Sequence, residues 1–277
     1  MLKYVRIILV ILFIAALVGA SGLYLYTTAH DDRTPPVFHA GDELLEISVN
    51  DPPEALLRDL TATDNVDGDL TGKIHVKDIS TLINKTDVNV TYVVFDEASN
   101  YALFTRTVRY KDYSSPRFLL TRPMVFSIGE TVNFRDSIRV QDMVDGNISG
   151  RLKLEETTVI NNTPGTYTAS FSVTNRMGDT AFLPLTVQIV DNSVSRPQIE
   201  LREYLIYLKP GDRTQFSRYL LSVTDPMAPA GETIPLNAVT VNASAVDSSV
   251  PGVYEVYYYY TGISGEVATT ILTVFVQ

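Results

Sequence analysis

The sequence predicts an all-β protein in which one membrane-spanning segment precedes three tandem β-sandwiches. Three observations support this fold class. The N-terminus carries a long uncharged apolar stretch, the remaining chain repeats a unit of about 80 residues, and apolar and polar residues alternate within each unit. The chain has 16 Tyr, many Val and Thr residues and no Cys, a composition typical of strands without disulfides.

The N-terminal segment predicts a helix that crosses a membrane. Residues 7–29 carry no charge, and residues 7–26 reach the roughly 20 apolar residues that a helix needs to cross the hydrocarbon core. Lys3 and Arg6 precede this stretch, and acidic residues follow it. Because positive flanks stay in the cytoplasm, we expect the N-terminus inside and the rest of the chain outside.

A cleaved signal peptide is the alternative for the same segment. Residues 18–20, Val-Gly-Ala, form a small-residue cleavage site after the apolar residues 7–17. The apolar run continues beyond that site to Tyr26, which favours a retained anchor. Residues 1–30 are therefore assigned to a cytoplasmic tip with an anchor or signal peptide, and both alternatives export the chain.

The rest of the chain repeats itself. Residues 61–74, TATDNVDGDLTGKI, parallel residues 139–152, RVQDMVDGNISGRL, which places Asp142 at 142 − 64 = 78 positions after Asp64. A fainter third copy places Asp225 at 225 − 142 = 83 positions further on. A period of this length suits a small domain rather than a helical solenoid. The predicted domains are residues 31–113, residues 114–192 and a divergent third at 193–277.

Alternation within the repeats predicts antiparallel sheets. In the second repeat Tyr167, Ala169, Phe171 and Val173 fall on one side of a strand, and Ser and Thr fall on the other. Several such short strands separated by turns are typical of a two-sheet sandwich. The segments between repeats are short and polar, so we expect a semi-rigid rod.

Two motifs of the first repeat resemble a known family. They are the turn DNVDGDL at residues 64–70 and the turn DEASN at residues 96–100, which precedes a Thr- and Val-rich strand. Both resemble the bacterial immunoglobulin-like repeat of surface proteins, a type also found in a pesticidal crystal protein and similar to the hyalin repeat. The resemblance implies immunoglobulin-like sandwiches used for display, spacing or adhesion, with no shared catalytic residues. It covers residues 35–112 and 115–191 well and residues 196–277 only weakly.

The acidic turns are candidate calcium sites. Ca²⁺ takes several oxygen ligands, and three carboxylates fall within six positions in the first repeat. The candidate ligands are Asp64, Asp67 and Asp69, with a weaker copy at Asp142, Asp145 and Asn147. The alternative is a plain turn, because Asp-Gly is a common turn dipeptide and no Glu closes the loop as in an EF-hand.

The third repeat carries a run of four tyrosines, Tyr257 to Tyr260. Alternation places Tyr254, Val256, Tyr258 and Tyr260 toward the core, and Glu255, Tyr257 and Tyr259 outward. Outward Tyr side chains stack against sugars or anchor a protein partner. The alternative is that these rings pack under a loop or a neighbouring domain.

Charge and motif content exclude several functions. The net charge of −10 becomes −10 − 2 = −12 beyond residue 29, and such a body repels nucleic acid. None of the three His lies in a hydrolase motif, and no glycine-rich phosphate loop is present. We therefore expect no enzyme activity and no cofactor apart from calcium.

These observations predict a single-pass protein of the bacterial cell membrane, anchored through residues 7–26. The first hypothesis is an extracytoplasmic stalk or scaffold of the cell envelope that contacts an envelope or surface protein. The alternative is a surface adhesin that binds a glycan or protein ligand through the third domain. The absence of Cys favours a bacterial origin, since exported animal proteins of this size usually carry disulfides.

Overall fold

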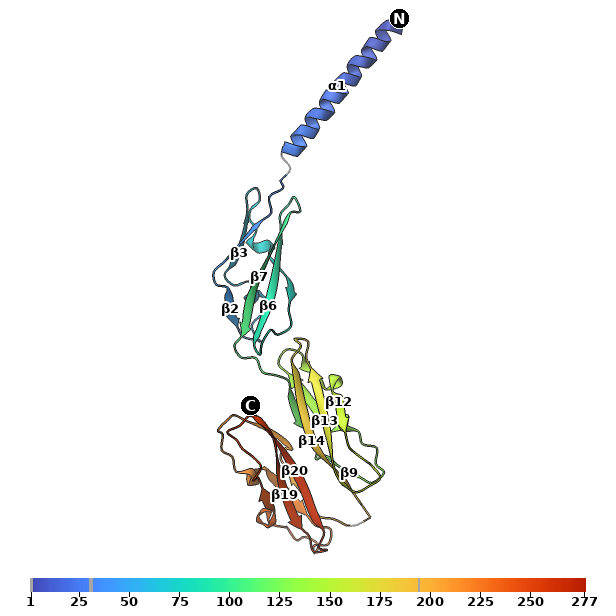
Figure 1. The fold of residues 1–277 in the computed structure, drawn as a ribbon, viewed down its shortest axis with the longest axis vertical. Helices are drawn as coiled ribbons and strands as arrows, with labels where there is room; N and C mark the ends of the chain where they lie inside the picture. Colours follow the sequence, from blue (N-terminus) through green and yellow to red (C-terminus); the bar gives the residue numbers. More distant parts are fainter. Residues whose placement is uncertain (1, 30–31, 194) are drawn as a thin grey trace. The chain divides into compact units, whose positions relative to one another are not determined.

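A computed structural model describes residues 2–29, 32–193 and 195–277, with the side chains of residues 2 and 26–29 left aside. Within these residues the chain consists mostly of β-sandwich-like sheets with one N-terminal helix, which confirms the predicted all-β class (Figure 1). It divides into two compact units, Met1–Asp112 and Tyr113–Gln277. The second and third repeats therefore share one unit, and their separation into independent domains stays a prediction.

The helix α1 spans Leu2–Ala29. Its stretch Lys3–Leu25 has a mean hydropathy of 2.6 and is long and apolar enough to cross a membrane. Every described side chain of this stretch is exposed, so the helix packs into no protein core. A membrane anchor and a signal sequence both have this apolar character.

The first unit continues with two sheets of unequal size. The smaller sheet has the order β1 (Val37–Ala40), β3 (Leu60–Asp64) and β4 (Gly68–Asp69). The larger has the order β2 (Leu44–Ile47), β7 (Tyr101–Tyr110), β6 (Asp87–Phe95) and β5 (His75–Ile79), with only the β2–β7 pair parallel. This unit also contains the short 3₁₀ turns η1 (Pro53–Leu57) and η2 (Thr71–Lys73). Alternate residues of β6, from Val88 to Val94, are fully buried and form the core with β7.

The second unit repeats this arrangement twice. The second repeat has β8 (Arg117–Leu120), β10 (Ile138–Asp142) and β11 (Gly146–Asn147) opposite β9 (Val125–Ser127), β14 (Thr180–Val190), β13 (Gly165–Thr174) and β12 (Lys153–Thr157). The third has β15 (Gln198–Leu201) and β17 (Leu220–Thr224) opposite β16 (Leu205–Leu208), β20 (Val267–Val276), β19 (Gly252–Thr261) and β18 (Thr240–Asn242). The 3₁₀ turns are η3 (Phe134–Asp136), η4 (Ser149–Arg151), η5 (Phe216–Tyr219) and η6 (Leu236–Ala238).

The second and third repeats pack against each other instead of extending as a rod. Leu205 and Phe275 of the third repeat belong to the apolar cluster of the second. The Phe275 ring lies 6.5 Å from the Phe118 ring, and Tyr207 Oη accepts a 2.7 Å hydrogen bond from Phe118 N. Since burying this apolar area stabilises the pair, the rod predicted from short linkers is wrong within this unit.

A Gly-x-Tyr step closes one end of the second and third repeats. A Cβ at Gly165 or Gly252 would lie 3.4 Å from the ring of the Tyr two positions later, so the ring covers bare backbone. Tyr167 Oη then donates to Thr163 O, and Tyr254 Oη donates to Val250 O, each at 3.0 Å. A Cβ at 3.4 Å from the ring would be in ordinary van der Waals contact, so the ring packs closely over each glycine.

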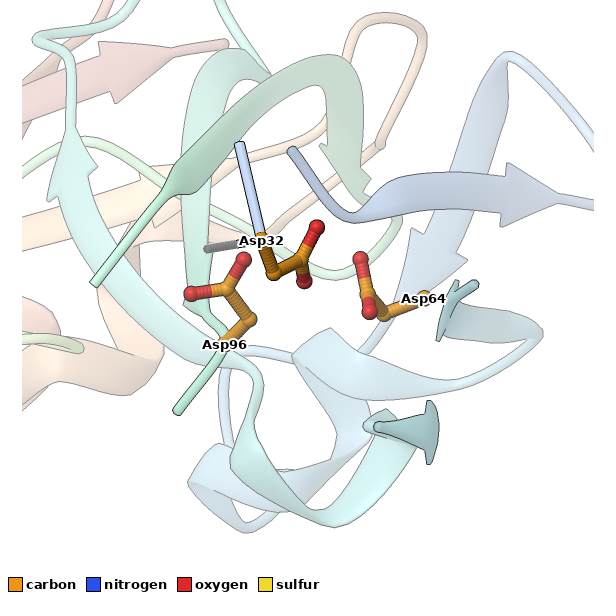
Figure 2. A group of neighbouring side chains, drawn as sticks. All are labelled: Asp32, Asp64 and Asp96. Carbon is orange, nitrogen blue, oxygen red and sulfur yellow. The ribbon is translucent and has the colours of Figure 1, made fainter. Parts of the chain in front are cut away.

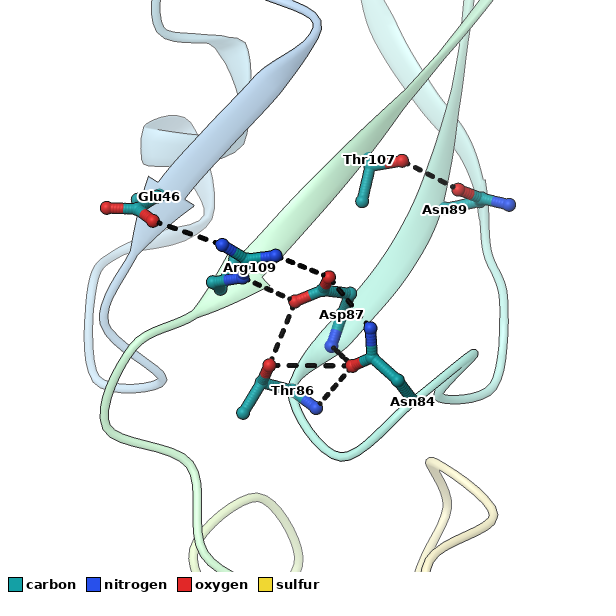
Figure 3. Close-up of polar contacts among 7 residues, drawn as sticks. All are labelled: Glu46, Asn84, Thr86, Asp87, Asn89, Thr107 and Arg109. Atoms are coloured by element: carbon teal, nitrogen blue, oxygen red, sulfur yellow. Dashed lines mark hydrogen bonds and ion pairs between the residues drawn. The ribbon is translucent and has the colours of Figure 1, made fainter.

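The first repeat closes the same end with an ion pair (Figure 3). Asp87 is 5% exposed, and its carboxylate accepts hydrogen bonds of 2.8 and 2.9 Å from Arg109. Asn84 Nδ2 and Thr86 Oγ1 donate to the same carboxylate at 2.8 and 2.9 Å. The Arg109 hydrogen bonds, followed by that of Asn84, hold the pKa of Asp87 well below its usual range. The buried charge is stable here because Arg109, Asn84 and Thr86 all donate to it.

Candidate metal centre

Three carboxylates meet at the other end of the first repeat (Figure 2). Asp32 comes from the segment before β1, Asp64 ends β3, and Asp96 begins the turn after β6. One oxygen of each lies within 4.8 Å of the other two. Two oxygens bound to one Ca²⁺ at 2.3–2.6 Å lie up to about 5 Å apart, so this spacing fits a single ion.

Local hydrogen bonds hold two of these carboxylates in place. Asp64 Oδ1 accepts from Val66 N at 2.8 Å and from Asp67 N at 3.0 Å, and these bonds lower the pKa of Asp64. Asp96 Oδ1 and Oδ2 accept from Asn100 N and Nδ2, both at 2.7 Å. The site is therefore arranged by its own turns before any ligand arrives.

The third carboxylate is held by the same turn. Asn100 Nδ2 donates at 3.0 Å to the backbone oxygen of Asp32, and Asp32 Oδ1 accepts from Thr34 N at 3.1 Å. Asn100 thus joins the segment before β1 to the turn after β6. This contact brings the Asp32 side chain toward the other two.

Two oxygens of this cluster have no hydrogen-bond partner. Asp32 Oδ2 and Asp64 Oδ2 are both buried, and neither meets a donor among the described residues. A buried polar atom without a partner costs about 1–3 kcal/mol, and adjacent like charges add to that cost. A cation between the carboxylates would remove both costs.

The second repeat fills the equivalent position with neutral groups. Asp142 keeps the turn of Asp64, and its Oδ1 accepts from Val144 N and Asp145 N, both at 2.8 Å. Asn175 stands where Asp96 stands in the first repeat, and its Nδ2 donates to Asp142 Oδ2 at 3.0 Å. Asp142 Oδ2 therefore has a hydrogen-bond donor, whereas the equivalent oxygen of Asp64 has none among the described residues.

A tyrosine hydroxyl completes this second network. Asn175 Nδ2 also donates to Tyr113 Oη at 2.8 Å, and Tyr113 Oη donates to Asp179 Oδ2 at 2.8 Å. Burial first, and then the hydrogen bond to Asp179, raise the pKa of Tyr113, so its hydroxyl remains protonated. The hydrogen bonds of this network are therefore complete without an ion.

The third repeat has no room for a carboxylate at the position of Asp96. Gly262 occupies the position of Asp96, and a Cβ there would lie 2.7 Å from Asp225 Oδ2. Asp225 Oδ2 instead accepts a 2.8 Å hydrogen bond from Ile263 N. One carboxylate and a backbone amide replace the three carboxylates of the first repeat.

The sequence-predicted ligands of the first repeat separate in the structure. Asp64 belongs to the cluster, but Asp67 Oδ2 accepts from Glu97 N at 2.7 Å. Asp69 Oδ1 accepts from Thr71 N at 2.9 Å, and hydrogen bonds from Thr71 lower the pKa of Asp69. These two side chains therefore brace the turns around the cluster.

The weaker predicted set, in the second repeat, is occupied by other contacts. Asp145 pairs with Arg151 and with Arg176, the latter at 3.2 Å. Burial raises the pKa of Asp145, but the hydrogen bonds from Arg176 and Arg151 lower it by more. Asn147 Oδ1 accepts from Ser149 N at 3.0 Å. Positive side chains already occupy the place where a cation would need Asp145.

Sequence reasoning missed Asp32 and Asp96. Asp96 lies in a turn that was identified from the sequence. The second repeat has Asn175 and Asp179 at the positions of Asp96 and Asn100, and this difference could have indicated that only the first repeat has a carboxylate at the first position. Asp32 carried no motif, because only the chain's path brings it to the turns.

The predicted contact surface of the third repeat is partly covered. Tyr257 and Tyr259 have parallel rings 6.1 Å apart, and Tyr257 Oη donates to Glu255 Oε2 at 2.6 Å. Glu255 Oε1 accepts from Thr186 N of the second repeat at 3.2 Å. All three side chains are half-buried, so the outward face predicted from alternation meets the neighbouring repeat.

A cavity of about 490 Å³ borders this surface. Its walls include Tyr257 and Glu255 of the third repeat, and Glu156, Thr168 and Thr186 of the second. Burial, followed by the hydrogen bond to Glu255, raises the pKa of Tyr257 to about 12. The residues that line it thus include tyrosines, threonines and carboxylates.

No protein-family model matches the chain. The chain is 27% identical over 223 residues to the pesticidal crystal protein Cry22Aa of Bacillus thuringiensis, a match that covers 78% of this chain and 29% of that protein. It is 26% identical over 224 residues to an uncharacterized 81.3 kDa protein of Acholeplasma phage L2, covering 77% and 28%. The chain therefore spans less than a third of the length of these curated relatives.

Solved structures give more distant likenesses. The chain is similar to the M60 catalytic domain with the CBM51-1 and CBM51-2 domains from Clostridium perfringens ZmpB, at 13% identity and a TM-score of 0.25, covering 57% of this chain and 31% of that chain. It is similar to Drosophila N-cadherin EC1-4 at 14% identity and a TM-score of 0.23, covering 89% and 76%. Likenesses at this level do not bear on the function of this chain.

Proposed function

We propose that this chain is a membrane-anchored, extracytoplasmic stalk or scaffold of the bacterial cell envelope, acting through protein–protein contacts. The observation that carries the proposal is an unburied apolar helix followed directly by consecutive sandwich repeats. Such a helix is stable only in lipid, and the repeats supply a surface outside the membrane. The protein acts without catalysis, and its three repeats serve as binding and spacing modules.

The orientation follows from the charges that flank the helix. Lys3 and Arg6 lie on the N-terminal side, so the N-terminus is cytoplasmic and the repeats are outside. A body of net charge −12 stays soluble beside an anionic membrane surface and does not adhere to it. A partner therefore approaches the repeats from the extracytoplasmic side.

Protease protection in intact cells tests the anchor and its orientation. Added protease is expected to degrade the repeats while a tag before Lys3 stays protected. The matched variant Lys3→Glu/Arg6→Glu removes the positive flank and is expected to reduce the correctly oriented fraction. Recovery of the protein from the medium with Ser21 at its N-terminus would refute the anchor.

Crosslinking in native membranes tests the scaffold role. The full-length chain is expected to recover one envelope protein in a fixed ratio. The double variant Tyr257→Ser/Tyr259→Ser should retain that partner, and loss of the partner would shift the function to the third repeat. Recovery of no envelope protein in a fixed ratio would contradict the scaffold role.

A second candidate function is ligand binding by a surface adhesin. The cavity lined by Tyr257 and Glu255 favours it, with Tyr259 stacked on Tyr257. Aromatic rings stack against sugar rings, and carboxylates accept hydrogen bonds from sugar hydroxyls. A glycan array probed with the purified chain is expected to give signals that the double variant loses. Tyr101→Ser, at an exposed Tyr of the first repeat, is the matched control and should keep them.

A further inference from the structure

We propose that Asp32, Asp64 and Asp96 form a Ca²⁺ site that fastens the segment after the helix to the first sandwich. Each side chain comes from a different part of the chain, and their oxygens lie within 4.8 Å of one another. Ca²⁺ prefers carboxylate oxygens and tolerates irregular geometry, so three carboxylates with water can complete its six to eight ligands. Figure 2 shows all three side chains pointing into the same space.

The unpartnered oxygens point to a cation independently of the acidic cluster. Asp32 Oδ2 and Asp64 Oδ2 are buried and meet no donor in the described part of the chain. Folded proteins satisfy nearly all such atoms, because a buried acceptor without a donor is costly. A cation bound between the two oxygens satisfies both of them together.

The second repeat supplies a comparison within the same chain. Its turn has the same backbone bonds to Asp142 as the first repeat has to Asp64, yet Asp142 Oδ2 has a partner in Asn175. Tyr113 Oη lies in the network between Asn175 and Asp179. The first repeat has carboxylates where the second has an amide and a hydroxyl, which is the difference expected between a cation site and a neutral contact.

Binding at this position has a structural consequence. Asp32 follows Ala29, the last residue of α1, after only residues 30 and 31. Within the described part of the chain, Asp32 also forms hydrogen bonds with Thr34 and Asn100. A cation shared with Asp64 and Asp96 therefore fixes the start of the sandwich, and its removal leaves like charges that push this segment away.

Calcium titration of the full-length chain in nanodiscs tests the site. After chelator treatment, hydrogen exchange is followed by mass spectrometry in peptides that contain Asp32, residues 64–68 and residues 96–100. Added CaCl₂ is expected to slow exchange in all three, with a midpoint of about 10⁻⁴–10⁻³ M, the range of extracellular calcium modules. Mg²⁺ alone is expected to need at least about tenfold more, because it demands a smaller and stricter shell.

Three variants separate this site from the turn motif. Asp32→Asn and Asp96→Asn each remove one charge and are expected to raise the midpoint at least about tenfold, equivalent to about 1.4 kcal/mol. Asp69→Asn is the matched control in the same region and should stay within about twofold of the parent chain. Hydrogen exchange of β6 and β7 without calcium shows whether each variant is folded. If Asp96→Asn is not folded, the calcium response of Asp32→Asn alone tests the site.

Two results would overturn the proposal. One is unchanged exchange in all three peptides at 10 mM CaCl₂, about ten times the highest expected midpoint. The other is a loss of the response in Asp69→Asn as large as that in Asp32→Asn, which would place any calcium in the turn instead.

Discussion

The first and second repeats share a fold but close their two ends with opposite chemistry. In the first repeat, charges close both ends: Asp87 with Arg109 at one, and the carboxylates of Asp32, Asp64 and Asp96 at the other. In the second repeat, the Tyr167 ring over Gly165 closes the first of these ends. The hydroxyl of Tyr113, bonded to Asn175, closes the other. The backbone turns are alike, so side chains alone decide whether an end depends on charge.

The largest expected difference lies at the ion pair. Asp87→Ala leaves Arg109 and Asn84 without their acceptor and should lower the unfolding free energy of the first repeat by about 2–3 kcal/mol, because breaking a buried pair is costly and Arg109 is partly exposed. Thr166 holds the equivalent place, since 96 − 87 = 175 − 166 = 9. Thr166→Ala should cost less than about 0.5 kcal/mol. Hydrogen exchange of β6 and β13 amides in the full chain measures both, and equal losses would contradict the comparison.

Acid should weaken the same end of the first repeat. The folded-state pKa of Asp87 is depressed, mainly by the Arg109 hydrogen bonds, so its stabilisation is present above the unfolded pKa of about 3.9. That stabilisation is lost as pH falls from there toward the depressed folded-state pKa. Exchange at pH 5 and pH 3 is expected to show the loss in β6, and Asp87→Asn should remove this component. An Asp87→Asn chain with the full acid response would assign it to other carboxylates.

The neutral end of the second repeat depends on one hydroxyl. Tyr113→Phe deprives Asn175 and Asp179 of a shared partner and should lower the unfolding free energy of the second unit by about 1–2 kcal/mol. In the first repeat, Asp32→Asn without calcium should be neutral or stabilising, because it relieves like charge. Urea unfolding followed by site-resolved exchange measures both variants. A destabilised Asp32→Asn chain would show that the cluster needs its charge even without a cation.

The two turn aspartates should differ in how much their charge matters. In calcium-free buffer, Asp64→Asn relieves the like charge of the cluster but weakens the acceptor of the Asp67 and Val66 amides, which lower the pKa of Asp64, so the stability of the first repeat should change little. Asp142→Asn weakens the acceptor of the Asn175 amide and is expected to destabilise the second unit by about 1 kcal/mol. Exchange of β3 and β10 amides reports each effect, and equal losses would mean that the two turns do not differ in charge balance.

The smallest expected effect concerns a backbone angle. Ser99 has φ 71°, where the second and third repeats place Gly178 and Gly265 at φ 79° and 83°. Ser99→Gly removes the strain of a side chain in the left-handed region and should stabilise the first repeat by about 0.5–1 kcal/mol. Thermal unfolding detects this shift, and Ala98→Gly, beside it, is the control that should not stabilise.

Much of the fold was predictable because strand alternation is local. The inward side of the second repeat and the burial of Val256 and Tyr258 in the third followed from the period of two, and both residues are fully buried. The candidate site was predictable only through Asp64. The sequence left open whether Tyr257 and Tyr259 face solvent or pack under a neighbouring domain, because alternation says which side of a sheet a residue faces but not what lies against that side.

The apolar helix, the recurring unit and the alternating strands can be predicted from the sequence alone, because each depends on residues that are neighbours along the chain. The meeting of Asp32, Asp64 and Asp96 depends on the folded arrangement, since sheet topology joins positions 32 apart along the chain (64 − 32 = 96 − 64 = 32). The packing of Phe275 into the second repeat depends on it too. Both depend on which distant surfaces bury apolar area or share charge when the chain folds, and a local pattern does not contain that information.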